Sequence, residues 1–180
     1  MNTTVTRYNG LSIALHWLML LLLIAVYATI ELRGIFPKGS DPRELMKTWH
    51  FMLGLSVLAL ALLRLLVNIT RSAPKITPEP PKWQALSAKL MHLALYVLMI
   101  VMPLAGWLIL SAAGKPIPFF GLHLPALIAE SKSLAGSIKE IHEAVGTAGY
   151  FLIGLHAAAA LYHHHVVRDN TLLRMLPKRR

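Results

Sequence analysis

Cysteine is absent from this sequence of 180 residues. Its absence excludes disulfide bonds, thiolate metal sites and iron–sulfur clusters. It also excludes haem attached through thioethers, which requires a Cys-x-x-Cys-His motif. Any metal or haem in this chain must therefore be held by other side chains, with histidine as the first candidate and methionine as the second.

Charged residues are scarce as well, at 14% of the sequence, whereas 56% of the residues are hydrophobic. A soluble domain usually has about a quarter of its residues charged. The hydrophobic residues gather in runs of the length, about 20 residues, that a helix needs to cross a bilayer. These features predict an integral membrane protein.

Acidic residues are the rarer charged class: 8 Asp and Glu stand against 18 Lys and Arg, for a formal net charge of +10. Such an excess can indicate nucleic-acid binding. Here the basic residues flank the hydrophobic runs, which is typical of topology signals and of contacts with lipid headgroups. We expect membrane lipid as a partner and no nucleic acid.

Four hydrophobic runs predict membrane-spanning helices at about residues 11–30, 46–68, 85–110 and 141–167. The first run is longer than the hydrophobic region of a signal peptide and lacks an obvious cleavage site, so we interpret it as a retained helix. The loop piece 119–128 is apolar enough to lie in the membrane interface. The expected fold is an all-α integral membrane four-helix bundle, one domain over residues 1–180.

The distribution of Lys and Arg predicts the orientation of these helices. The end with both termini and the proline-rich linker between the second and third runs has the larger number: Arg7, Arg64, Arg71, Lys75, Lys82, Lys89, Arg168, Arg174, Lys178, Arg179 and Arg180. The opposite end has Arg33, Lys38, Arg43, Lys47, Lys115, Lys132 and Lys139. Because basic residues favour the inner side, both termini are expected to face the cytoplasm.

Four histidines lie within the predicted spans: His16, His50, His142 and His156. An ionisable side chain in a membrane span is costly, so each is a candidate functional residue. His142 and His156 are fourteen residues apart on one helix, which is about 21 Å along the axis and roughly 40° short of four whole turns. They therefore face the same way at two depths. The topology matches His16 with His156 near the cytoplasmic side, and His50 with His142 near the outer side.

Two pairs of histidines at two depths predict two b-type haems, each held between two imidazoles. Iron with two imidazole ligands has no open position for oxygen and is suited to electron transfer. Gly54, Gly146 and Ala160 each follow a proposed ligand by four residues, so they lie on the ligand's face of the helix and leave room for a porphyrin. Two other interpretations remain open, namely hydrogen bonds between helices and a zinc site.

The other histidines give weaker signals. His92 lies near the cytoplasmic start of the third run and has no evident partner; it is either a polar packing group or part of a quinone site. His163 follows His156 by seven residues, about two turns, so it is expected to face inward beneath the cytoplasmic pair as a possible quinone contact. His164 and His165 are expected at the membrane interface, and His123 on the surface.

Several segments together resemble the bacterial cytochrome b561 family. The resemblance covers essentially the whole chain and is carried by residues 12–17, 31–37 and 49–50, by 149–156 with the preceding His142, and by 169–177. It implies a small di-haem protein of the inner membrane, with His16, His50, His142 and His156 as axial ligands of two b-type haems.

The same resemblance implies a function. The family exchanges electrons with the quinone pool, and its best-defined activity is superoxide oxidation at the periplasmic side with ubiquinone as the electron acceptor. A cluster at the outer end, Arg33, Lys38, Arg43 and Lys47, could steer the superoxide anion. We therefore expect a superoxide:ubiquinone oxidoreductase.

Three alternatives stay open at the level of sequence. One is a generic quinol-linked electron carrier, and another is the cytochrome b anchor subunit of a larger dehydrogenase or hydrogenase. The third belongs to a different class, a membrane channel or metal transporter lined by histidines. The sequence leaves the oligomeric state undetermined.

Overall fold

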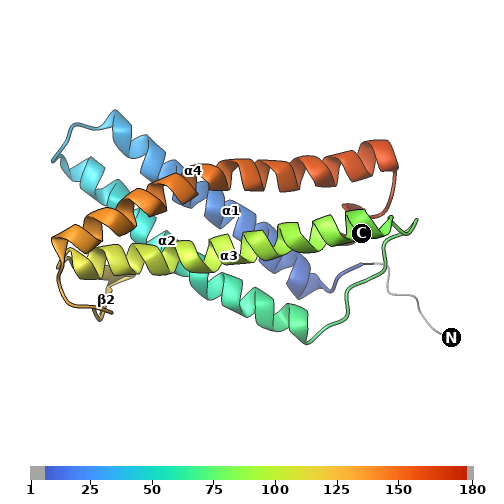
Figure 1. Cartoon of the computed structure of the whole chain (residues 1–180), viewed down its shortest axis with the longest axis horizontal. Helices are drawn as coiled ribbons and strands as arrows, with labels where there is room; N and C mark the ends of the chain where they lie inside the picture. The colour runs from blue at the N-terminus through green and yellow to red at the C-terminus, as the bar shows by residue number, and fades with distance from the viewer. Residues whose placement is uncertain (1–6, 178–180) are drawn as a thin grey trace.

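The computed structural model describes residues 7–177 and consists mainly of four long helices that run along its longest axis (Figure 1). They are α1 (Gly10–Leu32), α2 (Asp41–Ile69), α3 (Lys82–Ala112) and α4 (Lys132–Tyr162). Each is long and apolar enough to cross a membrane. The integral membrane four-helix fold predicted from the sequence is confirmed.

The connections divide the molecule into two ends. Both chain termini and the α2–α3 linker lie at one end, which we call the terminal end, and the α1–α2 and α3–α4 connections lie at the other (Figure 1). We call the latter the hairpin end, after a small β-hairpin in the α3–α4 connection. Residues 1–6 and 178–180 lie outside the described range, and with them the last three basic residues of the predicted cytoplasmic group.

The helices extend beyond the hydrophobic runs that predicted them. The largest difference is in α4, which begins at Lys132 rather than near residue 141, after Ser131 caps it by accepting a hydrogen bond from the Leu134 N–H at 3.4 Å. It also ends differently, because a π-helical turn at His163–Val167 follows Tyr162. Hydropathy marks only the part of a helix that contacts lipid, so its polar first turns escaped the sequence pattern.

Neighbouring helices pack in chain order, α1 on α2, α2 on α3 and α3 on α4. Along the described chain, the backbones of α1 and α4 come close at very few positions. One buried cluster joins the first three helices through Met19, Val57, Ala61 and Met99. The space between α1, α2 and α4 is therefore not closed by direct helix packing.

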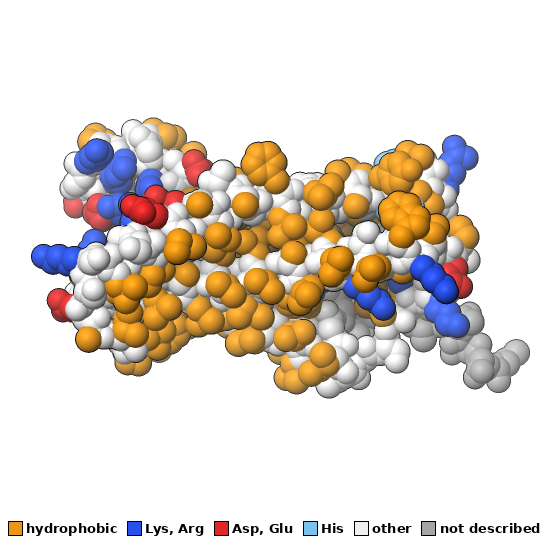
Figure 2. Space-filling model, in the orientation of Figure 1, with side chains coloured by type: hydrophobic (Ala, Val, Ile, Leu, Met, Phe, Trp, Pro, Cys, Tyr) orange, Lys and Arg blue, Asp and Glu red, His pale blue; other side chains and the backbone are white. Residues whose placement is uncertain are grey.

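Hydrophobic side chains cover the middle of the molecule, and charged ones gather at its two ends (Figure 2). Many large apolar side chains are exposed, for example Phe151 with 76% of its surface free. In water this exposure would be unfavourable, whereas in a bilayer these side chains contact lipid. The surface thus agrees with the helix lengths in indicating a membrane protein.

The β-hairpin was not expected from the sequence. Strands β1 (Ile117–Phe119) and β2 (Leu122–Leu124) pair antiparallel across a two-residue turn. Phe120 and Gly121 occupy the turn with φ of 46° and 87°, the positive values of a type I′ turn. The buried Ile117 packs on Leu55 and Leu110, so the β-hairpin covers α2 and α3 at the hairpin end.

Candidate functional site

The four membrane histidines meet in the two pairs predicted from their depths. The ring centroids of His16 on α1 and His156 on α4 are 6.2 Å apart. Those of His50 on α2 and His142 on α4 are 6.4 Å apart. Helix α4 therefore contributes one histidine to each pair.

These separations fit an iron between the two rings of each pair. An imidazole nitrogen binds a transition metal at about 2.0–2.1 Å and the ring centroid lies about 1.1 Å further on, so rings on opposite sides of one iron have centroids roughly 6.3 Å apart. Direct contact between two imidazoles would not require this spacing. The zinc alternative needs about four ligands, and among residues 7–177 no group of three or more His, Asp or Glu side chains forms such a cluster.

Hydrogen bonding around the rings also distinguishes them from ordinary packing groups. The Nδ1 of His50 lies 3.0 Å from the Val26 carbonyl oxygen. Donation from Nδ1–H fixes the ring and leaves Nε2 for a metal, as is usual for ligating histidines. The Nδ1 atoms of His16 and His142 are enclosed without a hydrogen-bond partner anywhere in residues 7–177. Burying such atoms is costly, which indicates that these histidines serve a function other than packing.

A cavity of about 1010 Å³ adjoins the His50–His142 pair. Its volume is at the upper end of the range for small-molecule sites, about 300–1,000 Å³. Gly54, Gly106 and Gly146 line it. A Cβ placed on Gly54 would meet no atom within 4 Å, and one on Gly106 would lie 3.7 Å from Cε1 of His142. The glycines thus keep a cofactor-sized space open beside the two rings.

Basic side chains surround this cavity where it reaches the hairpin end: Arg33, Lys38, Arg43, Lys47, Lys115 and Lys139. Two of them have partners nearby, because Lys47 pairs with Glu44 at 2.5 Å and Lys139 with Glu143 at 3.3 Å. Within residues 7–177, Arg33, Lys38 and Lys115 form no ion pair.

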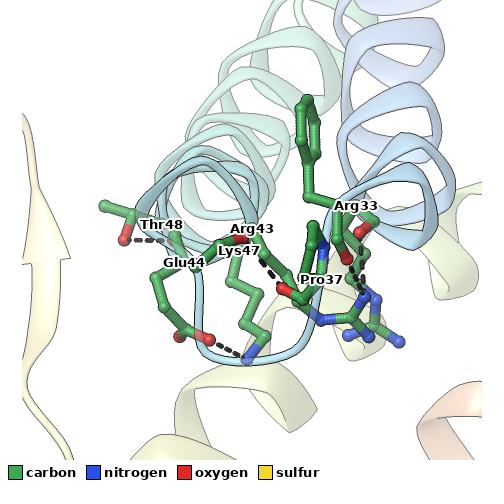
Figure 3. A network of polar contacts seen from close by, with 8 residues as sticks. Arg33, Pro37, Arg43, Glu44, Lys47 and Thr48 are labelled. Atoms are coloured by element: carbon green, nitrogen blue, oxygen red, sulfur yellow. Dashed lines mark hydrogen bonds and ion pairs between the residues drawn. The ribbon is translucent and has the colours of Figure 1, made fainter.

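Arg43 serves a structural purpose at this end (Figure 3). Its guanidinium donates hydrogen bonds to the carbonyl oxygens of Arg33 and Phe36, both at 2.9 Å. These bonds close the α1–α2 connection, which begins with a short 3₁₀ turn at Arg33–Ile35. Arg43 was predicted to help steer an anion; its Nη1 atom is engaged with the backbone, while the residue still lines the cavity.

Two tyrosines whose role the sequence did not indicate also line the cavity. The rings of Tyr27 and Tyr150 lie 4.3 Å apart between α1 and α4. Tyr27 donates a hydrogen bond to the Gly146 carbonyl at 2.9 Å, and Tyr150 donates to Glu31 at 2.8 Å. These contacts join α1 to α4 beside His142. Tyrosines in a hydrophobic run resemble interfacial residues, so no sequence signal distinguished this role.

At the terminal end, His92 lies beside the other pair. Its ring centroid is 5.6 Å from that of His156, a neighbour that was not evident from the sequence. Arg64 lies within electrostatic range of His16, His92 and His156. Its Nε is enclosed and has no hydrogen-bond partner in the described part of the chain.

The residues after α4 fold back over the terminal end. This segment, residues 168–177, is called the C-terminal strap below. Trp17, next to His16, donates a hydrogen bond to the Met175 carbonyl at 2.8 Å. Arg174 is buried and donates to the Pro74 carbonyl of the linker. The strap thereby connects α1, the linker and the end of α4 beneath the His16–His156 pair.

Comparison with known proteins identifies the family. The family model described as prokaryotic cytochrome b561 matches residues 7–178. Cytochrome b561 homolog 1 of Escherichia coli K12 is 42% identical over 97% of this chain and 99% of its own length. The chain belongs to the prokaryotic cytochrome b561 family.

Other relatives of this cytochrome b561 carry further names. A probable superoxide oxidase CybB of Yersinia pestis is 41% identical over 97% of this chain and 98% of its own length. Cytochrome b561 homolog 2 of Escherichia coli K12 is 30% identical over 97% of the chain and 94% of its own length. Members of the family bind b-type haem and transfer electrons across the membrane. This chain is thus a bacterial membrane protein of the oxidoreductase type.

Proposed function

We propose that this cytochrome b561 binds two b-type haems, one between His50 and His142 and one between His16 and His156, and oxidises superoxide with ubiquinone as acceptor. The observation that carries this proposal is the pair of ring separations, 6.4 and 6.2 Å, at two depths of α4. When bound, the haems supply one-electron carriers at both depths. The protein supplies the ligands, the enclosing helices and the charges at the two ends.

The proposed orientation places the terminal end in the cytoplasm of a bacterium and the hairpin end in the periplasm, in the inner membrane. Basic residues concentrated near the termini favour it. In this orientation the open cavity mouth faces the compartment that holds the electron donor. The C-terminal strap faces the compartment that supplies protons.

The charges at the hairpin end support an anionic donor. Superoxide is a small anion, and Arg33, Lys38 and Lys115 surround the cavity without ion-pair partners in residues 7–177. A positive field at a cleft raises the rate at which an anion arrives. The overall reaction is balanced when two superoxide ions become two molecules of oxygen while one ubiquinone takes up two electrons and two protons.

The terminal end supports quinone reduction. His163 and His92 are the proposed quinone contacts, and both lie on elements next to His156. An imidazole can donate a hydrogen bond to a quinone carbonyl oxygen. His92 also lies close to the His156 ring, which would bring the quinone near the ligand pair of this end.

One assay tests the proposal directly. Purified, haem-loaded protein supplied with superoxide from an enzymatic source should reduce ubiquinone well above the protein-free rate. Superoxide dismutase, added as a control, should abolish the reaction. If superoxide gives no quinol, while another donor at the hairpin end does, the protein is a generic electron carrier rather than a superoxide oxidase.

Charge reversal at the cavity mouth gives a second expected result. The Lys38→Glu variant should oxidise superoxide about three- to tenfold more slowly at low ionic strength, because the anion loses attraction on approach. The difference should shrink as salt is added. Lys132→Glu is the matched control: it makes the same change at the same end, outside the residues that line the cavity. Equal losses in the two variants would show that only the total charge matters.

A further inference from the structure

After α4 the chain reverses direction and brings Asp169 back toward the end of that helix. The π-helical turn at His163–Val167 is followed by Arg168 in the left-handed conformation, with φ of 60°. Only glycine adopts this conformation freely, so an arginine there is conformationally unfavourable. The Asp169 N–H donates to the His163 carbonyl at 3.2 Å. This reversal returns the Asp169 carboxylate to the His163 ring.

The contact between His163 and Asp169 is short, and Asp169 is buried. Nδ1 of His163 lies 2.5 Å from Oδ2 of Asp169, and the Asp169 residue is only 4% exposed. The other carboxylate oxygen accepts the Thr171 N–H at 2.8 Å. Burial by itself raises the pKa of Asp169, but the hydrogen bonds from His163 and Thr171 outweigh it and hold that pKa below its ordinary value. Asp169 is thus a carboxylate that accepts from Nδ1–H.

This contact leaves one nitrogen of His163 available. With Nδ1–H donated to Asp169, the ring is fixed and Nε2 can face a second partner. His163 follows His156 by seven residues and begins the π-helical turn after α4. The strap that carries Asp169 is attached to Trp17 beside His16. The pair therefore lies at the terminal end, beyond His156 along the chain.

We propose that His163 donates a proton to the quinone and that Asp169 is the positioning residue that makes this possible. The inference rests on the proposed function. As one ubiquinone takes up two electrons, derived from two superoxide ions that become oxygen, its two carbonyl oxygens each gain a proton. One proton passes from Nε2 of His163 to the quinone, while Nδ1–H stays donated to Asp169. Water at the terminal end supplies the second proton and then reprotonates His163.

The test compares haem-loaded variants in steady-state reduction of decylubiquinone, a short-chain ubiquinone, with superoxide as donor. Asp169→Asn removes the charge while keeping a side chain of similar shape. We expect its kcat to fall about 10- to 100-fold, the size of a lost acid–base contribution or somewhat less. Its KM for the quinone should change less than about threefold, because the residue does not touch the quinone. Asp169→Glu should recover part of the rate.

Two further variants separate positioning from a merely structural role. Glu79→Gln, which removes an exposed carboxylate at the same end, should leave kcat unchanged. In a His163→Gln background, Asp169→Asn should cause no additional loss, because Asp169 acts only through His163. Additive losses in the double variant would overturn the proposal. The comparison requires only that all variants have the same haem content.

The remaining outcomes are also decisive. If the wild type reduces decylubiquinone and Asp169→Asn does so equally fast, the role of Asp169 is refuted while the proposed function stands. If dithionite-reduced wild type is not reoxidised by decylubiquinone, the proposed function fails at its acceptor end, and the role of Asp169 fails with it. Normal reduction of the haems by superoxide in Asp169→Asn, together with slow reoxidation by quinone, supports the proposal.

Discussion

The His142→Ala variant is expected to lose the haem of the hairpin end and to retain the one at the terminal end. Its haem content should fall from about two to about one per chain, because an iron with only one imidazole is held weakly and the cavity is open at this end. The pairing at 6.4 Å requires His50→Ala to lose the same haem. His16→Ala and His156→Ala should lose the other one.

Reduced-minus-oxidised absorption spectra together with haem content measure this result. His123→Ala is the matched control, since His123 is exposed on β2 and away from both pairs. Its spectrum should match that of the wild type. If His50→Ala and His142→Ala perturb different haems, the pairing is incorrect, whatever the ring separations.

The Gly54→Trp variant should lose the same haem without loss of a ligand. A Cβ built on Gly54 would meet no atom within 4 Å. The large side chain of a tryptophan at this position would therefore occupy the cavity beside His50. Gly54→Ala adds a single methyl group, so it should keep both haems. It should also stabilise α2 slightly, by up to about 1 kcal/mol, because alanine favours a helix more than glycine does.

A second glycine provides the control for bulk alone. A Cβ added to Gly154 on α4 would also meet no atom within 4 Å, but this glycine is exposed and does not line the cavity. Gly154→Trp should therefore retain both haems in the membrane. Loss of haem from both tryptophan variants would mean that the effect comes from helix destabilisation rather than from the filled cavity.

The sequence was sufficient to predict the four spans and the pairing of their histidines. Both predictions depend on properties that can be read locally along the chain. These are the hydropathy of each run, the rise per residue of a helix, and the side of the membrane on which each helix begins. The Cα positions of His142 and His156 follow from helix geometry alone. Topology then determines which of the other two histidines reaches each depth.

Other parts of the site could not be predicted because they depend on how the chain reverses. Asp169 contacts His163 only because Arg168 adopts a left-handed conformation after a π-helical turn. Neither an arginine nor an aspartate in the sequence indicates such a reversal of the chain. The hairpin was missed for a related reason, since Gly121 was the one typical turn residue between two short strands. The position of Arg64 beside three histidines depends on the rotation of α2 against its neighbours.

Helix α4 has a consequence for how the two sites tolerate change. It carries His142 and His156 on one continuous helix, while their partners lie on two separate helices. A rotation or axial shift of α4 would misalign both ring pairs together, whereas a shift of α1 or α2 would disturb only one. The hydrogen bonds from Tyr27 to Gly146 and from Tyr150 to Glu31 connect α4 to α1, so they support both sites at once.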